Sequence, residues 1–208
     1  MLGLEEVIGL ELVSSDARVI GTVEGVGIDL EHWTVRALRV GLRRGMEELI
    51  GRKRHYFAVD KVYVRTSELE TVSDAIIMKR PVSAIAQVVQ AEESGLTPAG
   101  AFLGMRVICC DARFIGNVDN ILMDPPDGWS VPLVQVKLER DAQDELNLQR
   151  TFMSSSLISV RTADIKAIGD MVILSVTMND LKRTIAERTA NEAGAQEQSN
   201  APPQEIIR

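Results

Sequence analysis

Short apolar runs separated by polar turns dominate the pattern of this chain. Residues 34–40 (Thr-Val-Arg-Ala-Leu-Arg-Val) alternate apolar and polar side chains, as a strand with one buried face does. The polar turn at residues 14–18, which contains Asp16, separates two such runs and predicts a hairpin. The other runs of strand length are residues 9–13, 19–28, 56–64 and 75–78. This pattern predicts five or six short antiparallel strands, which are typical of a small β-barrel.

The same pattern occurs twice along the chain. Residues 9–21 (GLELVSSDARVIG) and 104–116 (GMRVICCDARFIG) share Gly, Asp-Ala-Arg and Ile-Gly at an offset of 95 residues. One residue is inserted within 124–128 (Asp-Pro-Pro-Asp-Gly), and from there the offset is 96, so that Trp33 matches Trp129. A repeat of this kind indicates two copies of one structural unit. We expect these units over residues 1–91 and 101–188.

A short helix is expected at the end of each repeat. Pro81 suits the first position of one helix, and Thr177 suits the N-cap of the other. Each helix has one apolar face and is expected to cover an open end of its own barrel: Val82, Ile85, Ala86 and Val89 in the first, and Met178, Leu181 and Ile185 in the second. Gly, Ser and Pro predict a linker at residues 92–100, and the polar, aperiodic residues 189–208 are expected to be disordered.

Composition narrows the functional classes only slightly. The chain has 208 residues, of which 45% are apolar and 4% aromatic, so aliphatic side chains must fill the core. Its formal charge of −7 argues against non-specific nucleic-acid binding, which needs a dominant basic surface. The sequence has no apolar run of membrane-spanning length and no pattern of a secretory signal, so we expect a cytoplasmic protein.

The opening of each repeat resembles the PRC-barrel family. In that family an Asp-containing turn is followed by Ile-Gly-x-Val, and the matching stretches are residues 16–23 (DARVIGTV) and 111–118 (DARFIGNV). Ala-Arg stands here where the family usually has Gly. Residues 124–128 resemble the turn of the family's next hairpin. The resemblance covers about residues 5–90 and 100–188, and it implies two tandem small antiparallel β-barrels, each followed by a short α-helix.

This resemblance also implies a function. Family members include the cytoplasmic domain of the photosynthetic reaction-centre H subunit, the C-terminal domain of a ribosome maturation factor, and free-standing archaeal proteins that look like adaptors of the cell-division machinery. The tandem, free-standing form is most similar to the archaeal group. It implies a non-catalytic adaptor that binds protein partners, with an intramolecular pseudo-dimer that is able to self-associate. The alternative is an RNA-processing or ribosome-assembly accessory protein.

The residues with reactive side chains form no recognisable catalytic or metal motif. Cys109 and Cys110 are adjacent, so in a strand they point to opposite faces and suit neither a shared metal nor a disulfide. His32 and His55 have no counterparts in the second repeat, whereas a metal site needs three or four convergent ligands. We therefore expect no enzyme activity and no cofactor or metal.

Three sets of residues are candidates for partner binding. A basic stretch in repeat one contrasts with acidic residues at the matching place in repeat two, although a solvated hairpin loop would also explain it. An arginine recurs after each Asp-Ala turn, and the two tryptophans match each other, either as core anchors or as contact residues. These candidates are Arg43, Arg44, Arg52, Lys53 and Arg54; Arg18 and Arg113; and Trp33 and Trp129.

Two further features of the sequence have a simpler meaning. Glycine and aspartate at matched places are expected to shape turns: Gly9, Asp16 and Gly21 in repeat one, and Gly104, Asp111 and Gly116 in repeat two. The apolar pair in Glu205-Ile-Ile-Arg208 follows a polar segment, as in short linear docking motifs.

Overall fold

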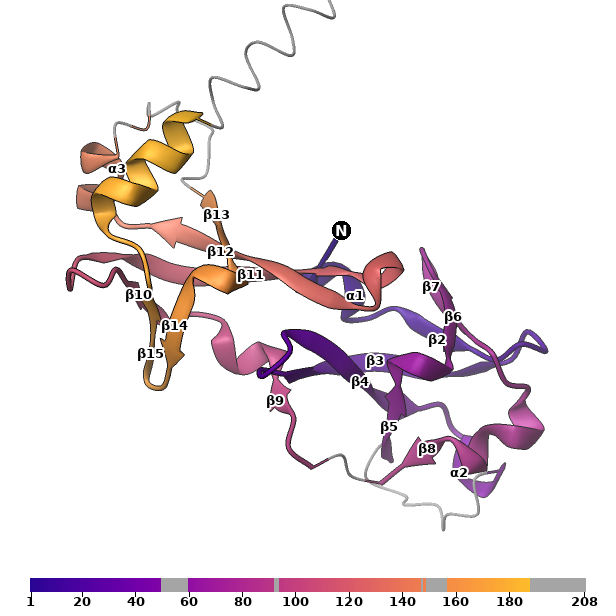
Figure 1. Cartoon of the computed structure of the whole chain (residues 1–208). Coiled ribbons are helices and arrows are strands. Elements are labelled where there is room, and N and C mark those ends of the chain that lie inside the picture. The colour runs from indigo at the N-terminus through magenta and orange to yellow at the C-terminus, as the bar shows by residue number, and fades with distance from the viewer. Residues whose placement is uncertain (50–59, 92–93, 147, 149–156, 188–208) are drawn as a thin grey trace, which may run out of the picture.

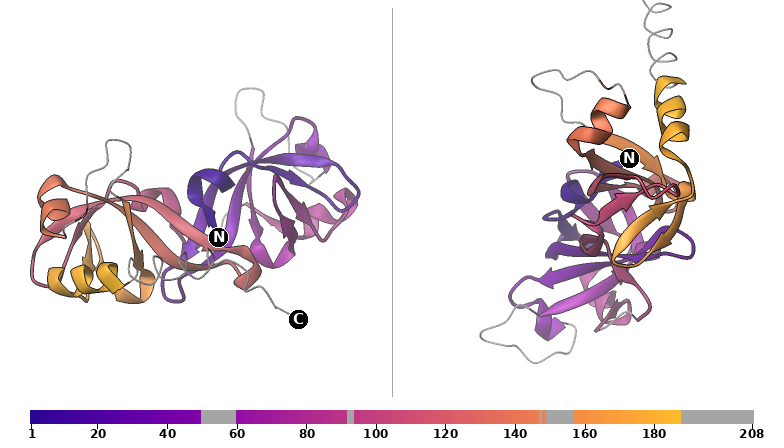
Figure 2. Two further views of the ribbon diagram at one scale, coloured as in Figure 1. Left: turned by 90° about the horizontal axis from the view of Figure 1, so that it is seen from above. Right: turned by 90° about the vertical axis from the view of Figure 1, so that its left-hand side faces the viewer.

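The fold is mainly β, and the two repeats form two lobes that lie side by side (Figures 1 and 2). The computed structural model describes residues 1–49, 60–91, 94–146, 148 and 157–187. In these residues all strands belong to one hydrogen-bonded sheet, whose main path runs β14-β15-β10-β11-β12-β4-β3-β2-β7-β6. The strand-rich prediction is therefore confirmed.

Repeat one builds its half of the sheet from a meander and one parallel return strand. Strands β2, β3, β4 and β5 pair antiparallel in order, β7 pairs parallel with β2, and β6 pairs with β7. The short β8 adds to β5. The bounds are β2 (Glu11–Val13), β3 (Val19–Asp29), β4 (Thr34–Leu42), β5 (Lys61–Arg65), β6 (Leu69–Val72), β7 (Ala75–Met78) and β8 (Val89–Gln90).

Repeat two has the same pairing pattern. Its strands β10 to β13 form the antiparallel meander, β15 pairs parallel with β10, and β14 pairs with β15. Leu12 faces Gly21 and Val107 faces Gly116, so even the register follows the 95-residue offset. The bounds are β10 (Arg106–Ile108), β11 (Phe114–Asp124), β12 (Ser130–Leu138), β13 (Leu157–Arg161), β14 (Ile165–Ile168) and β15 (Met171–Leu174).

The sheet does not close into a barrel, in contrast to the sequence-based expectation. Strands β6 and β14 lie at the two ends of the main path, and no pairing joins them to β5 or β13 among the described residues. Short 3-10 turns, η1 (Thr66–Glu68) and η5 (Thr162–Asp164), lie between these strands. Thr66 and Thr162 donate their hydroxyl groups to the carbonyl oxygens of Val35 and Val131, which ties each turn to β4 or β12 instead.

The two terminal helices differ from each other. Repeat one ends in the 3-10 helix η2 (Val82–Gln87), preceded by Pro81, and not in the expected α-helix. Repeat two has an α-helix over residues 178–187. Thr177 caps it as predicted, because its hydroxyl oxygen accepts from the Asp180 N–H at 3.2 Å while the Asp180 carboxylate accepts from the Thr177 N–H at 3.1 Å. The residue at the N-cap of η2 is Pro81, whose side chain makes no cap hydrogen bond, in contrast to Thr177.

The recurring aspartate links each hairpin turn to the helix that follows much later in the chain. The Asp16 carboxylate accepts from the Val82 N–H at 3.0 Å and from the Ser14 hydroxyl at 2.6 Å. The Asp111 carboxylate accepts from the Met178 N–H at 3.4 Å. The sequence predicted a local turn residue, and the structure adds a tertiary bond to the helix N-terminus. The Ser14 hydroxyl, followed by the Val82 N–H, lowers the pKa of Asp16.

The glycines that match between the two repeats have two different structural roles. Gly9 and Gly104 adopt φ angles of +94° and +78°, in the region that favours glycine. Gly21 and Gly116 lie inside β3 and β11, and not in turns as expected. A Cβ on either one would overlap the backbone carbonyl of the neighbouring strand, so both are needed for close strand approach.

The two repeats exchange their N-terminal segments. Strand β1 (Leu2–Gly3) pairs with β11 of repeat two, and β9 (Thr97–Pro98), within the predicted linker, pairs with β3 of repeat one. These two segments match at the 95-residue offset. The α-helix α1 (Leu4–Val7) follows β1, and the 3-10 helix η3 (Ala99–Phe102) follows β9. The remaining helices are α2 (Met46–Leu49), η4 (Pro125–Asp127) and α3 (Arg140–Glu145).

A second reciprocal contact joins the repeats where β4 meets β12. The Val35 N–H donates to the Trp129 carbonyl at 2.9 Å, and the Val131 N–H donates to the Trp33 carbonyl at 2.7 Å. Both tryptophans have positive φ, 48° and 62°. The paired hydrogen bonds and the exchanged segments relate the two repeats by an approximate twofold axis.

Substitution of the strand glycines tests the close approach of the strands. Gly21→Ala and Gly116→Ala are each expected to lower the free energy of unfolding by about 1–3 kcal/mol, because the added methyl group overlaps backbone. Urea denaturation measures the change. Gly169→Ala, at a position with open space around it, serves as the control and is expected to stay within about 0.5 kcal/mol of the wild type. Equal effects at all three positions would contradict this explanation.

The turn alanines are expected to respond in the opposite direction. Ala17 and Ala112 adopt φ angles of 59° and 63°, which are unfavourable for a residue with a Cβ. Ala17→Gly and Ala112→Gly should each raise the free energy of unfolding by about 0.5–1 kcal/mol. Ala167→Gly, in the exposed part of β14, is the matched control and should lower it by a similar amount. A loss of stability at the two turns would disprove the argument.

The bond from Asp16 to η2 predicts a pH dependence of stability. Because the folded state lowers the pKa of Asp16, this carboxylate stabilises the fold above the ordinary aspartate pKa, and the contribution is lost as the pH falls through the lowered value. Asp16→Asn should therefore reduce the loss of stability between neutral and acidic pH. In an NMR titration, Ser14→Ala should raise the pKa of Asp16 toward the ordinary range. An unchanged pKa would contradict the role of the Ser14 hydroxyl.

Candidate functional site

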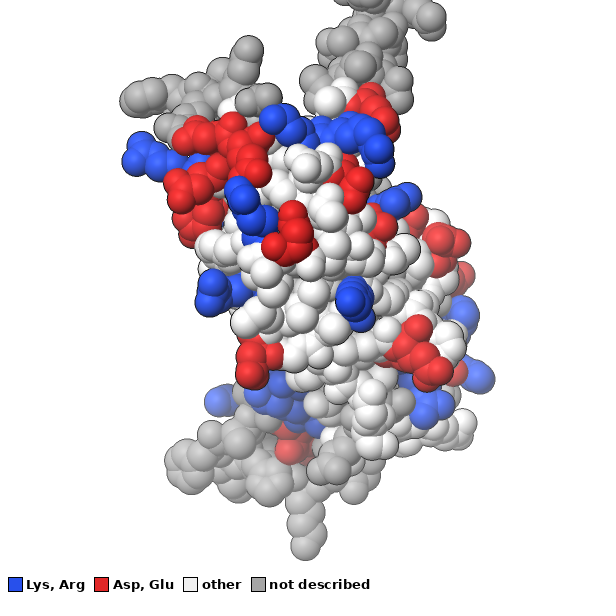
Figure 3. Space-filling view, turned by 60° about the vertical axis from the view of Figure 1, so that its left-hand side comes forward, with Lys and Arg blue, Asp and Glu red and all other residues white. Residues whose placement is uncertain are grey.

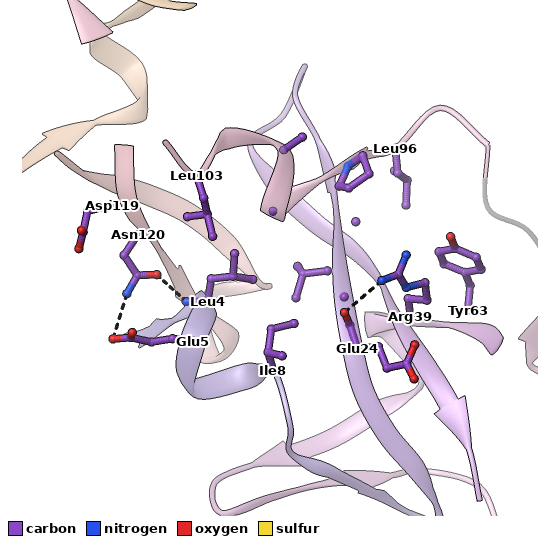
Figure 4. Close-up of a pocket in the computed structure, with 16 residues that line it drawn as sticks. Leu4, Glu5, Ile8, Glu24, Arg39, Tyr63, Leu96, Leu103, Asp119 and Asn120 are labelled. Carbon is purple, nitrogen blue, oxygen red and sulfur yellow. Dashed lines mark hydrogen bonds between the residues drawn. The ribbon is translucent and has the colours of Figure 1, made fainter. Parts of the chain in front are cut away.

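A groove lies at the junction of the two repeats, on the approximate twofold axis (Figure 4). Its volume is about 530 Å³, within the range of binding sites for small molecules and short peptides. The exchanged segments build it, since α1 of repeat one and residues 96–103 of repeat two face β3 and β11 across it. Small residues in its wall leave the space open: Gly25, Gly27, Gly100 and Ala101.

Two exposed aliphatic residues flank this junction groove. Ile8 follows α1 and is 40% exposed, and Leu103 follows η3 and is 45% exposed. They occupy the same place in the two repeats, at an offset of 95. Few large apolar side chains of the described residues are as exposed as these. Together with the partly buried Leu96 and the buried Leu4, they give the groove an apolar centre.

The repeat-one end of the groove carries a cation. The Arg39 guanidinium lies against the backbone of Gly25, and its Nη2 donates to the Glu24 carbonyl at 3.2 Å. Its Nε is buried and has no hydrogen-bond partner among the described residues. The nearby Glu24 carboxylate also lines the groove and is paired with Lys61 at 3.0 Å. Tyr63 lies beside Arg39 (Figure 4).

The repeat-two end is acidic. Asn120 is buried, and its Oδ1 accepts from the Leu4 N–H at 2.9 Å, which fixes α1 against β11. Its Nδ2 donates to the Glu5 carboxylate at 3.5 Å. Asp119, next to Asn120, is exposed at this end. Glu5 and Asp119 both line the end of the groove away from Arg39, with the Glu5 carboxylate turned toward the Asn120 amide (Figure 4).

The groove is therefore polarised although the two repeats match. Asn120 stands where repeat one has Gly25, and Gly100 stands where repeat one has Glu5. Gln135 stands where repeat one has Arg39, so only one end of the groove carries a guanidinium, which lies over the bare Gly25. Glu5 adds a carboxylate at the other end, whereas its counterpart in repeat two is Gly100. Chemically, the groove suits an apolar group with an acidic end toward Arg39 and a basic end toward Asp119.

The predicted tryptophans lie at the junction but outside this groove. Trp129 is buried, and Trp33 is partly buried with its ring 6.1 Å from that of Phe102 in η3. Trp129 borders a different depression, formed with Pro125, Pro126 and residues of β6. Trp129 is buried as a core anchor would be, whereas for the partly buried Trp33 both alternatives stay predictions.

The two recurrent arginines are exposed but have different neighbours. Arg18 lies 3.9 Å from the Asp16 carboxylate, whereas Arg113 forms an ion pair with Glu145 of α3. Neither arginine lines the junction groove. Exposed ion pairs of this kind contribute little to stability. Their contact with a partner stays a prediction.

The basic stretch of repeat one is only partly described. Arg43 and Arg44 are exposed just before α2, and Arg52, Lys53, Arg54 and His55 lie outside the described residues. In repeat two, acidic and basic side chains are mixed at the end of the lobe, and a largely uncharged band crosses the middle of the face in Figure 3. A separate basic docking surface therefore stays a prediction.

The cysteines and the described histidine have ordinary environments. Cys109 is buried, and burial raises its pKa to about 12, so the reactive thiolate is disfavoured; Cys110 is exposed. His32 bonds to the Asp29 carboxylate at 2.9 Å, and this bond is the main cause of the lowered pKa of Asp29. In the part of the chain that the structure describes, no group of three or more His, Cys, Asp or Glu residues could hold a metal ion.

Sequence reasoning missed the residues that form the groove. Ile8 and Leu103 carry a usable signal, because each is an aliphatic residue directly before the glycine that opens its repeat. Arg39 gives no such signal, since its position in an alternating strand is that of an ordinary exposed residue. Only the exchange of segments between repeats brings Arg39 and Asp119 to one groove.

Comparison with known proteins adds no family assignment. No described helix is long and apolar enough to cross a membrane. No protein-family model matches the chain, and no curated protein matches it either.

Proposed function

We propose that this chain is a non-catalytic adaptor that binds a segment of a protein partner in its junction groove. In this proposal the two repeats are tandem PRC-barrel-like units, and their intramolecular pairing takes the place of a dimer. The resemblance of residues 16–23 and 111–118 to that family supports the proposal. By the same resemblance the protein acts in an archaeal cytoplasm, and its partner belongs to the cell-division machinery.

The single observation that carries this proposal is the polarised apolar groove between the repeats. Its centre exposes Ile8 and Leu103, although burial of two such side chains is favourable. Full burial of a leucine or isoleucine contributes about 1.5–3 kcal/mol, so covering this half-exposed pair supplies roughly 1–3 kcal/mol in total. A bound segment would realise this gain.

The charges at the groove ends define the occupant. The partly buried Arg39 guanidinium lines one end of the groove and favours an acidic side chain there. Asp119 and Glu5 favour a basic side chain at the other. The segment that fits best has two aliphatic residues between an acidic residue at the Arg39 end and a basic residue at the Asp119 end. A groove of about 530 Å³ accommodates such a short segment and not a folded domain.

Selection from a random peptide library on the full chain tests this function. We expect enrichment of peptides in which two aliphatic residues are flanked by an acidic residue on one side and a basic residue on the other. Their affinity should fall at least tenfold for Leu103→Asp, because a charge then lies in the apolar centre of the groove. Fluorescence anisotropy with the selected peptides measures the affinity.

Ile77→Asp is the matched control for this experiment. Ile77 is 40% exposed, as Ile8 is, but it lies on β7 away from the groove, so binding should be retained. Equal binding by the wild type and by Leu103→Asp would rule out the groove as the binding site. Selection of uniformly acidic or uniformly basic peptides would rule out the stated polarity.

A further inference from the structure

We infer that Glu205–Arg208 of this same chain is a ligand for the junction groove and competes there with the partner. The inference rests on the proposed function, since it takes the groove as a site for short segments. These four residues lie outside the described part of the structure. The inference therefore comes from their sequence and from the chemistry of the groove.

The order of side chains in this segment matches the groove from end to end. Glu205 is acidic, Ile206 and Ile207 are aliphatic, and Arg208 is basic. With Glu205 at Arg39, the aliphatic pair reaches Ile8 and Leu103 at the groove centre. Arg208 then lies at the acidic end, beside Asp119 and Glu5. The reversed orientation would place like charges together at both ends, which is unfavourable.

The Arg39 end of the groove favours an incoming acidic side chain. The Arg39 side chain makes no ion pair among the described residues, and its Nε is buried without an acceptor. The Arg39 side chain is only partly buried and lines the groove, so an incoming carboxylate can form a charge-assisted hydrogen bond with its guanidinium. The Glu24 carboxylate, which also lines the groove, is paired with Lys61.

The length of the connecting chain allows the contact. Residue 205 follows the last described residue, Glu187, by 18 positions. An extended chain of that length spans up to about 60 Å. Strand β11 of the same lobe lines the groove with Asp119 and Asn120, and its 11 residues extend about 36 Å, so a span of this length reaches from the helix end to the groove. The intervening residues are polar and include Pro202 and Pro203, which interrupt helices.

Tethering makes even a weak contact effective. A segment tethered within one chain by a short linker has an effective concentration of about 1 mM. A segment that binds in trans with a dissociation constant near 100 μM would then occupy the groove about nine-tenths of the time, and a partner peptide would bind about tenfold more weakly. A partner would then bind only at a correspondingly higher concentration or with a higher affinity, which is a simple form of autoinhibition.

Competition between the tethered and a free segment tests the inference. The probe is a fluorescent peptide of residues 199–208, amidated so that only its side chains carry the charges. It is titrated against the full chain and against the full chain with Ile206→Ser and Ile207→Ser. We expect about tenfold tighter binding to the double variant, because its own segment no longer competes. Equal binding to both chains would overturn the inference.

Charge exchange fixes the site and the orientation. In the double-variant background, Asp119→Lys should weaken the peptide at least threefold, and a peptide with Arg208→Glu should restore the affinity. Asp119 is exposed, so the change should not disturb folding. Leu103→Asp should abolish binding and Ile77→Asp should preserve it. Loss of affinity without rescue by the exchanged peptide would overturn the stated orientation.

The outcomes separate this inference from the proposed function. If library peptides bind the groove but the 199–208 peptide does not, the inference fails and the function stands. If the peptide binds the double variant and the wild type equally, the segment is a ligand only in trans and the autoinhibition fails. If neither the library peptides nor this peptide depends on Leu103, both proposals fail.

Discussion

The reciprocal pairing of the two repeats is the constraint on which the rest of this structure depends. Val35 and Val131 each donate a backbone hydrogen bond to the tryptophan carbonyl of the other repeat, at 2.9 and 2.7 Å. These bonds join β4 to β12, so that two meanders become one sheet. They occur only because Trp33 and Trp129 adopt left-handed backbone conformations at the ends of their hairpins. The strain at two large residues is offset by the burial that the junction provides.

The exchange of N-terminal segments has the same origin and a further consequence. Strand β1 pairs with repeat two and β9 with repeat one, so neither repeat completes its sheet alone. The exchange also places Ile8 and Leu103 beside the twofold axis, where neither is covered. A groove on an axis formed by identical copies would have two equal ends. Here the two copies differ at Arg39 and Gln135 and at Glu5 and Gly100, and these differences give the two ends opposite charge, which allows a directional ligand.

Duplication within one chain accounts for this combination of symmetry and polarity. Positions that the backbone geometry requires have the same residue in both copies. Gly21 and Gly116 are an example, because a Cβ at either would overlap the neighbouring strand. Positions around the groove have diverged, as Glu5 and Gly100 show. In a homodimer the groove could not become asymmetric in this way, because both subunits contribute the same side chains on either side of the twofold axis.

Much of the fold could be predicted from local patterns. The alternation in residues 34–40 gave β4, and the 95-residue offset gave the matched pairings of β10 and β11. The cap at Thr177 was predictable because Asp180 stands three residues later. Whether each barrel closes could not be predicted from the sequence. Closure depends on which strands pair with β6 and β14, the strands that follow η1 and η5. The hydroxyl bonds of Thr66 and Thr162 to β4 and β12 have no sequence signature beyond a common residue type.

The sequence by itself determined the strands, the duplication and the turn residues, because each depends on interactions within a few residues or on simple repetition. Only the tertiary structure decided that the repeats exchange segments and that the sheet stays open. It also decided that Arg39 and Asp119, 80 residues apart in number and unremarkable in their strands, face one groove. Contacts of that range depend on how two surfaces pack against each other, and no local pattern of side chains records this.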